Sequence, residues 1–337
     1  MGDMKKKTDY MTREQLRIVF MGTPEFAVAT LRRLVEGGYN VVAVVTQPDK
    51  PVGRHGSVLQ PPEVKKYALE RGIPVLQPEK MKDPAFVEQL RAYDADLQVV
   101  VAFRMLPEVV WGMPRMGTFN VHAALLPQYR GAAPINWAII NGEKQTGVTT
   151  FFLDHDIDTG KVILRRTFDI PDDADVEYVY NGLMELGARA ATDTIDMLIE
   201  GDGYVEALPQ DTLTDGNTPL KAAPKIFKET CRIDWTKTSK QVYDFVRGLS
   251  PVPGAWTTLR HMDGSEEQVM KVYHTTKADG VTVQGGPGTL WVEKNKLYVT
   301  TGEGVLTIDV LQLAGKKRMQ ARDFINGFKN IGDTMLG

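Results

Sequence analysis

The feature that most constrains this chain is the alternation of short apolar runs with amphipathic segments over residues 16–205. LRIVFM (16–21) is typical of a buried strand, PEFAVATLRRLVEGG (24–38) of a helix that begins at Pro24, and VVAVVT (41–46) of a second buried strand. A strand, a helix and a strand within about thirty residues indicate a parallel βαβ unit.

The same alternation continues to about residue 205. Candidate helices lie at 62–71, 83–92, from 134, and at 176–200, and candidate strands at 74–76, 97–103, 119–122 and 147–153. We therefore predict a doubly wound, mostly parallel α/β sheet, because strands that alternate with helices build this class of fold.

The sequence changes in character after residue 205. Residues 210–224 are rich in Asp, Thr, Gly, Asn and Pro, which is typical of a linker. One candidate helix (239–248) then precedes short strand candidates: AWTTLR, VMKVYH, GTLWV, KLYVT and GVLTIDVL. They indicate a small β-barrel, OB-like in its strand count. We predict an N-terminal tail (1–15), an α/β domain (16–205), a linker (206–225) and a C-terminal barrel domain (226–337).

Composition narrows the class of protein. Hydrophobic residues make up 42% and charged residues 25% of the chain, as in soluble globular proteins. No stretch approaches the ~20 apolar residues that cross a bilayer, and the charged N-terminus lacks a secretory signal. The single cysteine, Cys231, fits a reducing compartment. We expect a cytoplasmic protein with no membrane partner.

Charge is unevenly distributed. Residues 221–337 carry 17 Lys and Arg against 12 Asp and Glu, whereas residues 1–220 carry 23 against 31. A basic C-terminal part is compatible with a polyanionic partner. Two segments offer candidate phosphate contacts, although each also fits a solvated loop: TQPDKPVGRHGS (46–57), with Lys50 and Arg54, and QLAGKKRMQARDF (312–324), with Lys316, Lys317 and Arg318.

Asn120 and His122 lie two residues apart in the strand candidate FNVH, so their side chains share one face. Parallel α/β sheets bind ligands at the carboxyl ends of their strands, where this pair is expected. The pair alone also fits a structural histidine. No second His or Cys lies at metal-ligand spacing, so we expect no zinc site.

The acidic segment LDHDIDTG (153–160) places Asp154, Asp156 and Asp158 at alternate positions. An EF-hand would require Gly at the sixth place and Glu at the twelfth, where this chain has Thr159 and Arg165, so calcium binding is disfavoured. Either the segment is an acidic surface turn, or Asp158 is the carboxylate partner of His122.

The first βα turn, GTPEFA (22–27), has one Gly where a dinucleotide-binding G-x-G-x-x-G turn has three. A nicotinamide dehydrogenase is therefore disfavoured. The turn still fits a ligand edge, because it follows a strand.

Several motifs together resemble the methionyl-tRNA formyltransferases. FMGTPEFA, TQPDKPVGR, FNVHAALLPQYRGAAPINWAI, TGVTTFFLDHDIDTG, RIDW, RGLSPVPGAW and LQLAGKK occur in the order seen in that family and cover nearly the whole chain after residue 16. The Asn-x-His, Leu-Leu-Pro, Arg-Gly and Asp-Thr-Gly set is shared by all formyl-tetrahydrofolate transferases. The long loop after the second strand and the segment from RIDW to GKK narrow the resemblance to the tRNA enzymes.

The resemblance implies a metal-free, monomeric enzyme that takes 10-formyltetrahydrofolate and initiator methionyl-tRNA as substrates. The implied site residues are the catalytic Asn120, His122 and Asp158, the folate contacts Ala124, Leu125, Leu126 and Pro127, and the tRNA contacts Lys50, Arg54, Lys316, Lys317 and Arg318.

Two departures from the family pattern stand out. Ala124 replaces the usual Ser before Leu-Leu-Pro, and His55, Gly56 and Ser57 replace a more Lys-rich run after Arg54. A folate contact at position 124 is therefore expected from the backbone. Two rival functions remain: formyl transfer to a small amine, such as a glycinamide ribonucleotide or an amino sugar, and tRNA binding without catalysis.

Overall fold

The computed structural model describes residues 11–52, 58–264 and 267–337. The chain forms two compact units. The first unit comprises Met1–Arg130, Gly147–Phe168 and Asn181–Lys221, and the second comprises Gly131–Thr146, Asp169–Tyr180 and Ala222–Gly337. The unit boundary after Lys221 falls inside the segment predicted as a linker.

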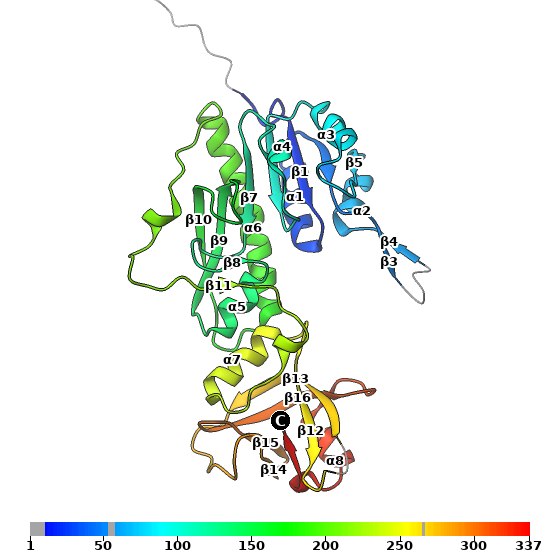
Figure 1. Ribbon diagram of the computed structural model, residues 1–337, viewed down its shortest axis with the longest axis vertical. Coiled ribbons are helices and arrows are strands. Elements are labelled where there is room, and N and C mark those ends of the chain that lie inside the picture. The colour runs from blue at the N-terminus through cyan, green and yellow to red at the C-terminus, as the bar shows by residue number, and fades with distance from the viewer. Residues whose placement is uncertain (1–10, 53–57, 265–266) are drawn as a thin grey trace, which may run out of the picture. The chain divides into compact units, whose positions relative to one another are not determined.

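The first unit is built on a seven-stranded sheet in the order β10-β9-β7-β6-β1-β2-β5 (Figure 1). The central strands pair in parallel, and β7 pairs with β9 in the antiparallel sense. Its strands are β1 (Ile18–Gly22), β2 (Val41–Val45), β5 (Val75–Leu76), β6 (Leu97–Val101), β7 (Thr118–His122), β9 (Gln145–Phe152) and β10 (Val162–Asp169).

Strand β10 was not predicted from the sequence. Only its first residues, Val162 and Ile163, are buried, and Arg165 and Arg166 interrupt what would otherwise be an apolar alternation. Such a strand lacks the apolar period that identifies buried strands in a sequence. The other strands of this sheet lie where the apolar runs predicted them.

Helices cover both faces of this sheet. Val19, Met21 and Val100 pack in one apolar cluster with buried residues of α3 and α4. On the other face, Gly187 of α6 lies so close to Val121 that an added Cβ would approach its side chain to 3.2 Å. The helices are α1 (Glu25–Glu36), α2 (Glu63–Glu70), α3 (Pro84–Arg91), α4 (Glu108–Trp111) and α6 (Val176–Glu200).

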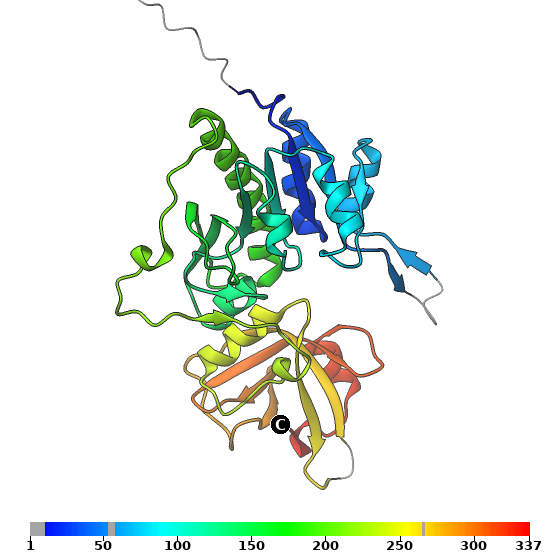
Figure 2. The same cartoon turned by 45° about the horizontal axis from the view of Figure 1, so that its top comes forward.

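A hairpin of β3 (Lys50–Val52) and β4 (Val58–Gln60) projects from the first unit (Figures 1 and 2). Its six strand residues are exposed. The segment before it is fixed by Asp49, which accepts hydrogen bonds from Lys65 Nζ at 2.8 Å and from Gln77 Nε2 at 2.7 Å. These two bonds lower the pKa of the Asp49 carboxyl, so the base of the hairpin is anchored by a charged group.

The second unit contains an antiparallel sheet in the order β14-β15-β16-β13-β12-β18. An antiparallel bridge between Thr289 and Met335, and the bond from Leu336 N–H to Gly288 O at 2.8 Å, join its two ends. The sheet therefore closes into a barrel. Its strands are β12 (Ala255–His261), β13 (Glu267–Lys277), β14 (Leu290–Glu293), β15 (Lys296–Thr300), β16 (Val305–Leu313) and β18 (Thr334–Leu336), with β17 (Met319–Gln320) paired to β16.

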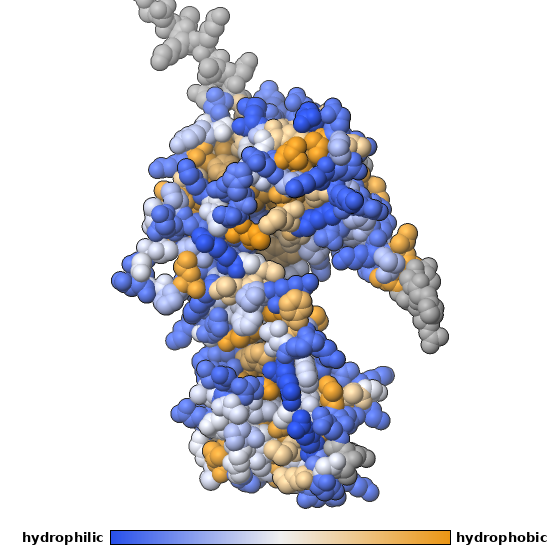
Figure 3. Space-filling view, viewed as in Figure 1, coloured by the Kyte–Doolittle hydropathy of each residue, from blue (hydrophilic) through white to orange (hydrophobic). Residues whose placement is uncertain are grey.

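The core of the barrel unit is apolar, whereas the face seen in Figure 3 is mostly hydrophilic. Helix α7 (Ser239–Leu249) begins with a capping box between Thr238 and Gln241, which satisfies N–H groups that the first turn leaves open. Trp235, from the RIDW motif, is buried and donates to Thr257 Oγ1 at 2.9 Å.

The remaining short elements are α5 (Pro134–Ile140), α8 (Ala321–Gly327), β8 (Arg130–Gly131), β11 (Ala222–Ala223), η2 (Gln210–Leu213), η3 (Glu229–Cys231) and η4 (Ile331–Asp333). The predicted fold class, a mostly parallel α/β sheet followed by a small β-barrel, is confirmed. Within the described ranges, no helix has both the length and the apolar composition that a membrane span requires.

Candidate active site

Asn120 and His122 lie at the carboxyl end of β7, on the sheet face covered by α3 and α4. Asn120 is the register partner of Val100, whose side chain packs in the α3 and α4 cluster. Because residues in register share a face and strand residues alternate, His122 points to the same side as Asn120. His122 is 6% exposed, and Asn120 is half-buried.

The His122 imidazole has a polar neighbour at each nitrogen. Nε2 lies 2.9 Å from the carbonyl oxygen of Tyr129, and Nδ1 lies 3.8 Å from Oδ2 of Asp158. A carbonyl only accepts, so Nε2 carries the hydrogen in this arrangement. The ring of Phe151 packs edge-on at 6.4 Å between centroids. Protonation of His122 would therefore place the second N–H on the side that faces Asp158.

Asp158 reaches His122 from the turn between β9 and β10. Its φ of +55° is in the left-handed region, which Asp tolerates better than most residues. Two residues later, Gly160 lies against the carbonyl of Phe152 so closely that a Cβ would collide with that backbone oxygen. Gln210 Nε2 donates to the carbonyls of Asp158 at 2.7 Å and Gly160 at 2.9 Å. The turn is thus fixed by contacts to its backbone.

The predicted folate segment follows β7 and is tied to β9. Ala124 is fully buried, and its carbonyl accepts from Thr149 Oγ1 at 2.7 Å. Leu126 N–H donates to the same hydroxyl at 3.0 Å, and Arg165 Nη1 donates to Leu126 O at 3.3 Å. The Leu126–Pro127 peptide is cis. Leu125 alone among the four residues has a partly exposed side chain.

The first βα turn lies at the same edge of the sheet. Gly22 ends β1, and an added Cβ there would approach Val101 O to 2.9 Å and Ala27 Cβ to 2.6 Å. The single Gly of this turn is therefore explained by tight packing between β1, β6 and α1.

The predicted tRNA contacts lie in two places. Lys50 is exposed on β3, whereas Arg54 lies outside the described residues. Lys316, Lys317 and Arg318 are exposed in the turn between β16 and β17. The Arg318 guanidinium stacks on the ring of Tyr273, 3.7 Å from its centroid, so its direction is restricted by a cation–π contact.

The sequence analysis did not identify four residues of this region: Tyr129, Thr149, Arg165 and Gln210. Thr149 could have been identified, because a hydroxyl in the buried strand GVTTFFL needs a hydrogen-bond partner. Gln210 could not, since it lies among residues whose composition is that of a linker. In the described part of the chain, no group of three or more His, Cys, Asp or Glu side chains is arranged to hold a metal ion.

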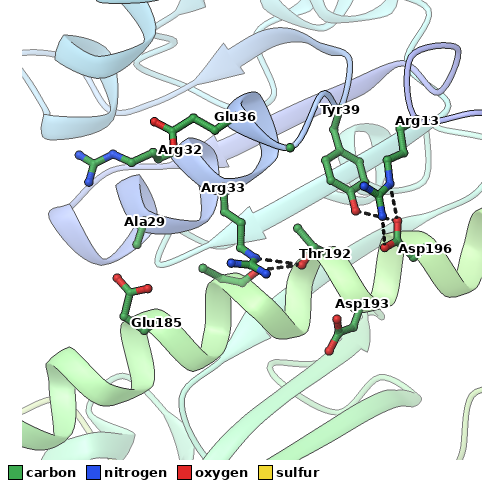
Figure 4. A pocket seen from close by; sticks show the side chains of 12 residues that line it. Arg13, Ala29, Arg32, Arg33, Glu36, Tyr39, Glu185, Thr192, Asp193 and Asp196 are labelled. Carbon is green, nitrogen blue, oxygen red and sulfur yellow. Dashed lines mark hydrogen bonds and ion pairs between the residues drawn. The ribbon is translucent and has the colours of Figure 1, made fainter.

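A surface pocket of about 470 Å³ between α1 and α6 contains none of the predicted site residues (Figure 4). Two of its side chains pair with the Asp196 carboxylate: Arg13 at 2.6 Å, and Tyr39 through its hydroxyl at 2.6 Å. Burial, followed by this hydrogen bond, raises the pKa of the Tyr39 phenol. The pairing ties α6 to residues beside α1, which is a structural role.

Two family models match the chain: formyl transferase over residues 16–195, and formyl transferase C-terminal domain over residues 225–329. Two solved structures share the fold. HypX from Aquifex aeolicus in complex with tetrahydrofolic acid has a TM-score of 0.61 at 19% identity, covering 94% of this chain and 48% of that one. The sugar 3N-formyl transferase WlaRD has a TM-score of 0.61 at 18% identity, covering 90% and 99%.

The fold and both family matches define a formyl transferase. Curated relatives narrow the class. The methionyl-tRNA formyltransferase of Parabacteroides distasonis is 58% identical over 97% of this chain and 100% of the relative. That of Phocaeicola vulgatus is 56% identical over 97% and 100%. The chain belongs to the methionyl-tRNA formyltransferase family, and the resemblance inferred from its motifs is confirmed.

Proposed function

We propose that this chain transfers the formyl group of 10-formyltetrahydrofolate to the α-amine of methionine on initiator tRNA. Family membership supports the reaction. The observation that carries the site assignment is the approach of His122 Nδ1 to Asp158 Oδ2 at 3.8 Å, on the sheet face that also bears Asn120.

The first chemical step is attack of the amine on the formyl carbon, which gives a tetrahedral carbon with an oxyanion. The Asn120 amide and the Nδ1–H of protonated His122 are the donors proposed for this oxyanion. Donors in a partly dehydrated site stabilise such charge, and removing one typically costs about 100- to 1,000-fold in rate. Tyr129 O holds the other imidazole N–H, so the ring orientation is set before substrate binds.

Besides facing the His122 imidazole, Asp158 is proposed to accept a proton. The attacking amine becomes an ammonium group and loses its proton to the Asp158 carboxylate, directly or through water. The intermediate then collapses: the C–N bond to the folate breaks, and the leaving folate nitrogen gains the proton that Asp158 took up, directly or through water. The products are formylmethionyl-tRNA and tetrahydrofolate. The mechanism calls for neither a metal ion nor a covalent enzyme intermediate.

The folate and tRNA contacts are proposals of the same kind. Ala124, Leu125, Leu126 and Pro127 are assigned to the folate. Ala124 has no hydroxyl to offer, and its carbonyl already accepts from Thr149, so folate contact there falls to the neighbouring backbone and to Leu125. Lys50, Arg54, Lys316, Lys317 and Arg318 are assigned to tRNA phosphates. We also propose that the enzyme is a cytoplasmic monomer, that residues 16–205 are catalytic and that residues 226–337 bind tRNA.

The direct test is formyl transfer from 10-formyltetrahydrofolate to methionyl-tRNA by Asn120→Ala, His122→Ala and Asp158→Ala. Each variant is expected to lose turnover while its circular dichroism spectrum and melting temperature stay near wild type. Asp156→Ala is the matched control, because Asp156 is an exposed carboxylate on the same turn. Near-wild-type formylation by His122→Ala would show that His122 is not a catalytic residue.

A small amine and uncharged tRNA belong in the same assay. Transfer to the small amine at a rate comparable to that for methionyl-tRNA would favour the rival small-amine function. Folate binding without any formyl transfer would favour a tRNA-binding protein that has lost catalysis.

A further inference from the structure

Gln210 contacts the backbone of the candidate catalytic residue Asp158, although its segment is compositionally a linker. Leu208 and Val162 exchange backbone hydrogen bonds at 2.8 Å in both directions. This pairing places the segment after α6 along the start of β10, two residues from Gly160. Gln210 is 4% exposed, so its amide is removed from solvent.

The amide of Gln210 is fully used. Its Nε2 donates to Asp158 O and Gly160 O, and its Oε1 accepts from Arg130 Nε at 3.0 Å and Nη2 at 2.6 Å. A side-chain amide offers two N–H donors and two lone pairs, so all four are matched. A buried polar network satisfied in this way holds one arrangement, because any displacement leaves a desolvated group without a partner.

These bonds close a ring through the candidate site. His122 binds the carbonyl of Tyr129; the next residue, Arg130, binds Gln210; Gln210 binds the backbone of Asp158; and the Asp158 carboxylate faces His122 again. The ring links the Asn-x-His strand, the Arg-Gly motif and the Asp-Thr-Gly turn. Tyr129 and Gln210 are the members of the ring that lie outside these motifs, and Tyr129 directly precedes Arg130.

We propose that Gln210 is a positioning residue for formyl transfer, which fixes the Asp158 turn against His122 through the two N–H donors of its amide. The inference rests on the proposed function, since it assumes that Asp158 and His122 are catalytic. Gln210 is assigned no contact with either substrate. Its effect is on geometry, and a displacement of about 1 Å at a reacting group can cost 100-fold in rate.

The experiment compares Gln210→Met and Gln210→Glu with wild type in steady-state formylation of methionyl-tRNA. Met keeps the length of the side chain and removes every hydrogen bond. Glu keeps an acceptor for Arg130 and replaces the donors with a carboxylate that opposes the carbonyls of Asp158 and Gly160. Both variants are expected to lower kcat by about 10- to 100-fold and to leave KM for each substrate within about twofold.

Gln128→Met is the matched control. Gln128 also joins the loop after β7 to the segment after α6, through Lys221 N–H at 2.8 Å and Pro219 O at 3.3 Å, but it does not contact the Asp158 turn. We expect its kcat to stay within about twofold of wild type. An equal loss of kcat in Gln128→Met would show that attachment of the segment, rather than Gln210, sets the rate, and would overturn the proposal.

Three other outcomes also count against the proposal: wild-type kcat in folded Gln210→Met, a raised KM with unchanged kcat, or loss of the fold in both Gln210 variants, which would make the role structural. Asp158→Asn is measured beside them. If wild type does not formylate methionyl-tRNA, the proposed function fails. If Asp158→Asn keeps wild-type kcat, the catalytic role of Asp158 fails, and with it the positioning role of Gln210. If Asp158→Asn loses kcat while Gln210→Met does not, only the positioning role fails.

Discussion

Two turns of the molecule carry candidate functional residues, and they differ in how far the side chains of those residues are exposed. The turn between β9 and β10 places Asp158, and its backbone is fixed by Gln210, by the packing of Gly160 and by the short span to β10. The turn between β16 and β17 carries Lys316, Lys317 and Arg318 as exposed side chains, and Arg318 alone rests on a ring.

The difference follows from the task proposed for each turn. A carboxylate that takes a proton must lie within hydrogen-bond reach of the reacting group, so small displacements matter. Cations that attract phosphates act through charge over several ångströms, and their effect is screened by salt. Changes to the backbone are therefore expected to impair the proton transfer proposed for the first turn. Changes of charge are expected to weaken the tRNA binding proposed for the second.

The largest expected effect is that of Gly160→Ala. Its Cβ would collide with the carbonyl oxygen of Phe152, so the backbone must shift and take Asp158 with it. We expect kcat to fall at least about 100-fold. Gly315→Ala is the counterpart in the second turn, where φ is +75° and a Cβ would meet nothing within 4 Å.

Gly315→Ala is expected to cost about 1 kcal/mol in backbone conformation and to leave kcat unchanged. Thermal unfolding and formylation kinetics of the two variants, measured side by side, check the contrast. Equal kcat in both variants would show that the Asp158 turn tolerates movement.

The second effect is on salt dependence. The variant with Lys316, Lys317 and Arg318 all changed to Ala is expected to bind methionyl-tRNA more weakly at low salt. Removing one phosphate-binding cation lowers the slope of log K against log salt by about 0.9, so the slope should fall by up to about 3. Filter binding over a salt series measures the slope. At saturating tRNA, kcat should match wild type. An unchanged slope would show that this turn does not contact the phosphates of tRNA.

A smaller effect is expected from Thr149→Val. Val preserves the shape but removes the hydroxyl that donates to Ala124 O and accepts from Leu126 N–H. We expect a loss of about 1–3 kcal/mol in the free energy of unfolding and a raised KM for the folate, because the folate segment is released from β9.

Thr150→Val serves as its control. The Thr150 hydroxyl pairs with Thr194 Oγ1 at 2.7 Å, away from the folate segment. Stability should fall in both variants, but only Thr149→Val should change the KM for the folate. A folate KM raised equally in the two variants would point to a general loosening of β9.

The smallest effect is a pH dependence in the barrel. A hydrogen bond to Asp309 at 2.8 Å raises the pKa of His274 above its ordinary 6.5. A raised folded-state pKa means that the stabilisation is present below pH 6.5 and is lost as pH rises through the folded value.

His274 is 59% exposed, so the contribution to the free energy of unfolding should stay below about 1 kcal/mol. Chemical denaturation of wild type and His274→Gln across this pH range measures the free energy of unfolding of each protein. The difference between the two free energies should shrink at high pH. A difference that grew with pH would contradict stabilisation by protonated His274.

The sequence predicted those features that depend on residues close together in the chain. Apolar runs identified the buried strands, and strand parity placed Asn120 and His122 on one face. Strand β10 escaped prediction, because most of its residues are exposed or only partly buried. Gln210 escaped because its partners are 50 and 52 residues away at Gly160 and Asp158, and composition does not register such a contact.

The placement of residues 181–221 in the first unit bears on how such enzymes can be recombined. A chimera that exchanges the barrel between two relatives needs a junction, and composition alone would put it near residue 205. A junction there would separate Gln210 from Asp158 and pair the donor amide of one parent with the turn of the other. A junction after Lys221 keeps both partners from a single parent, and so leaves the inherited geometry of the site intact.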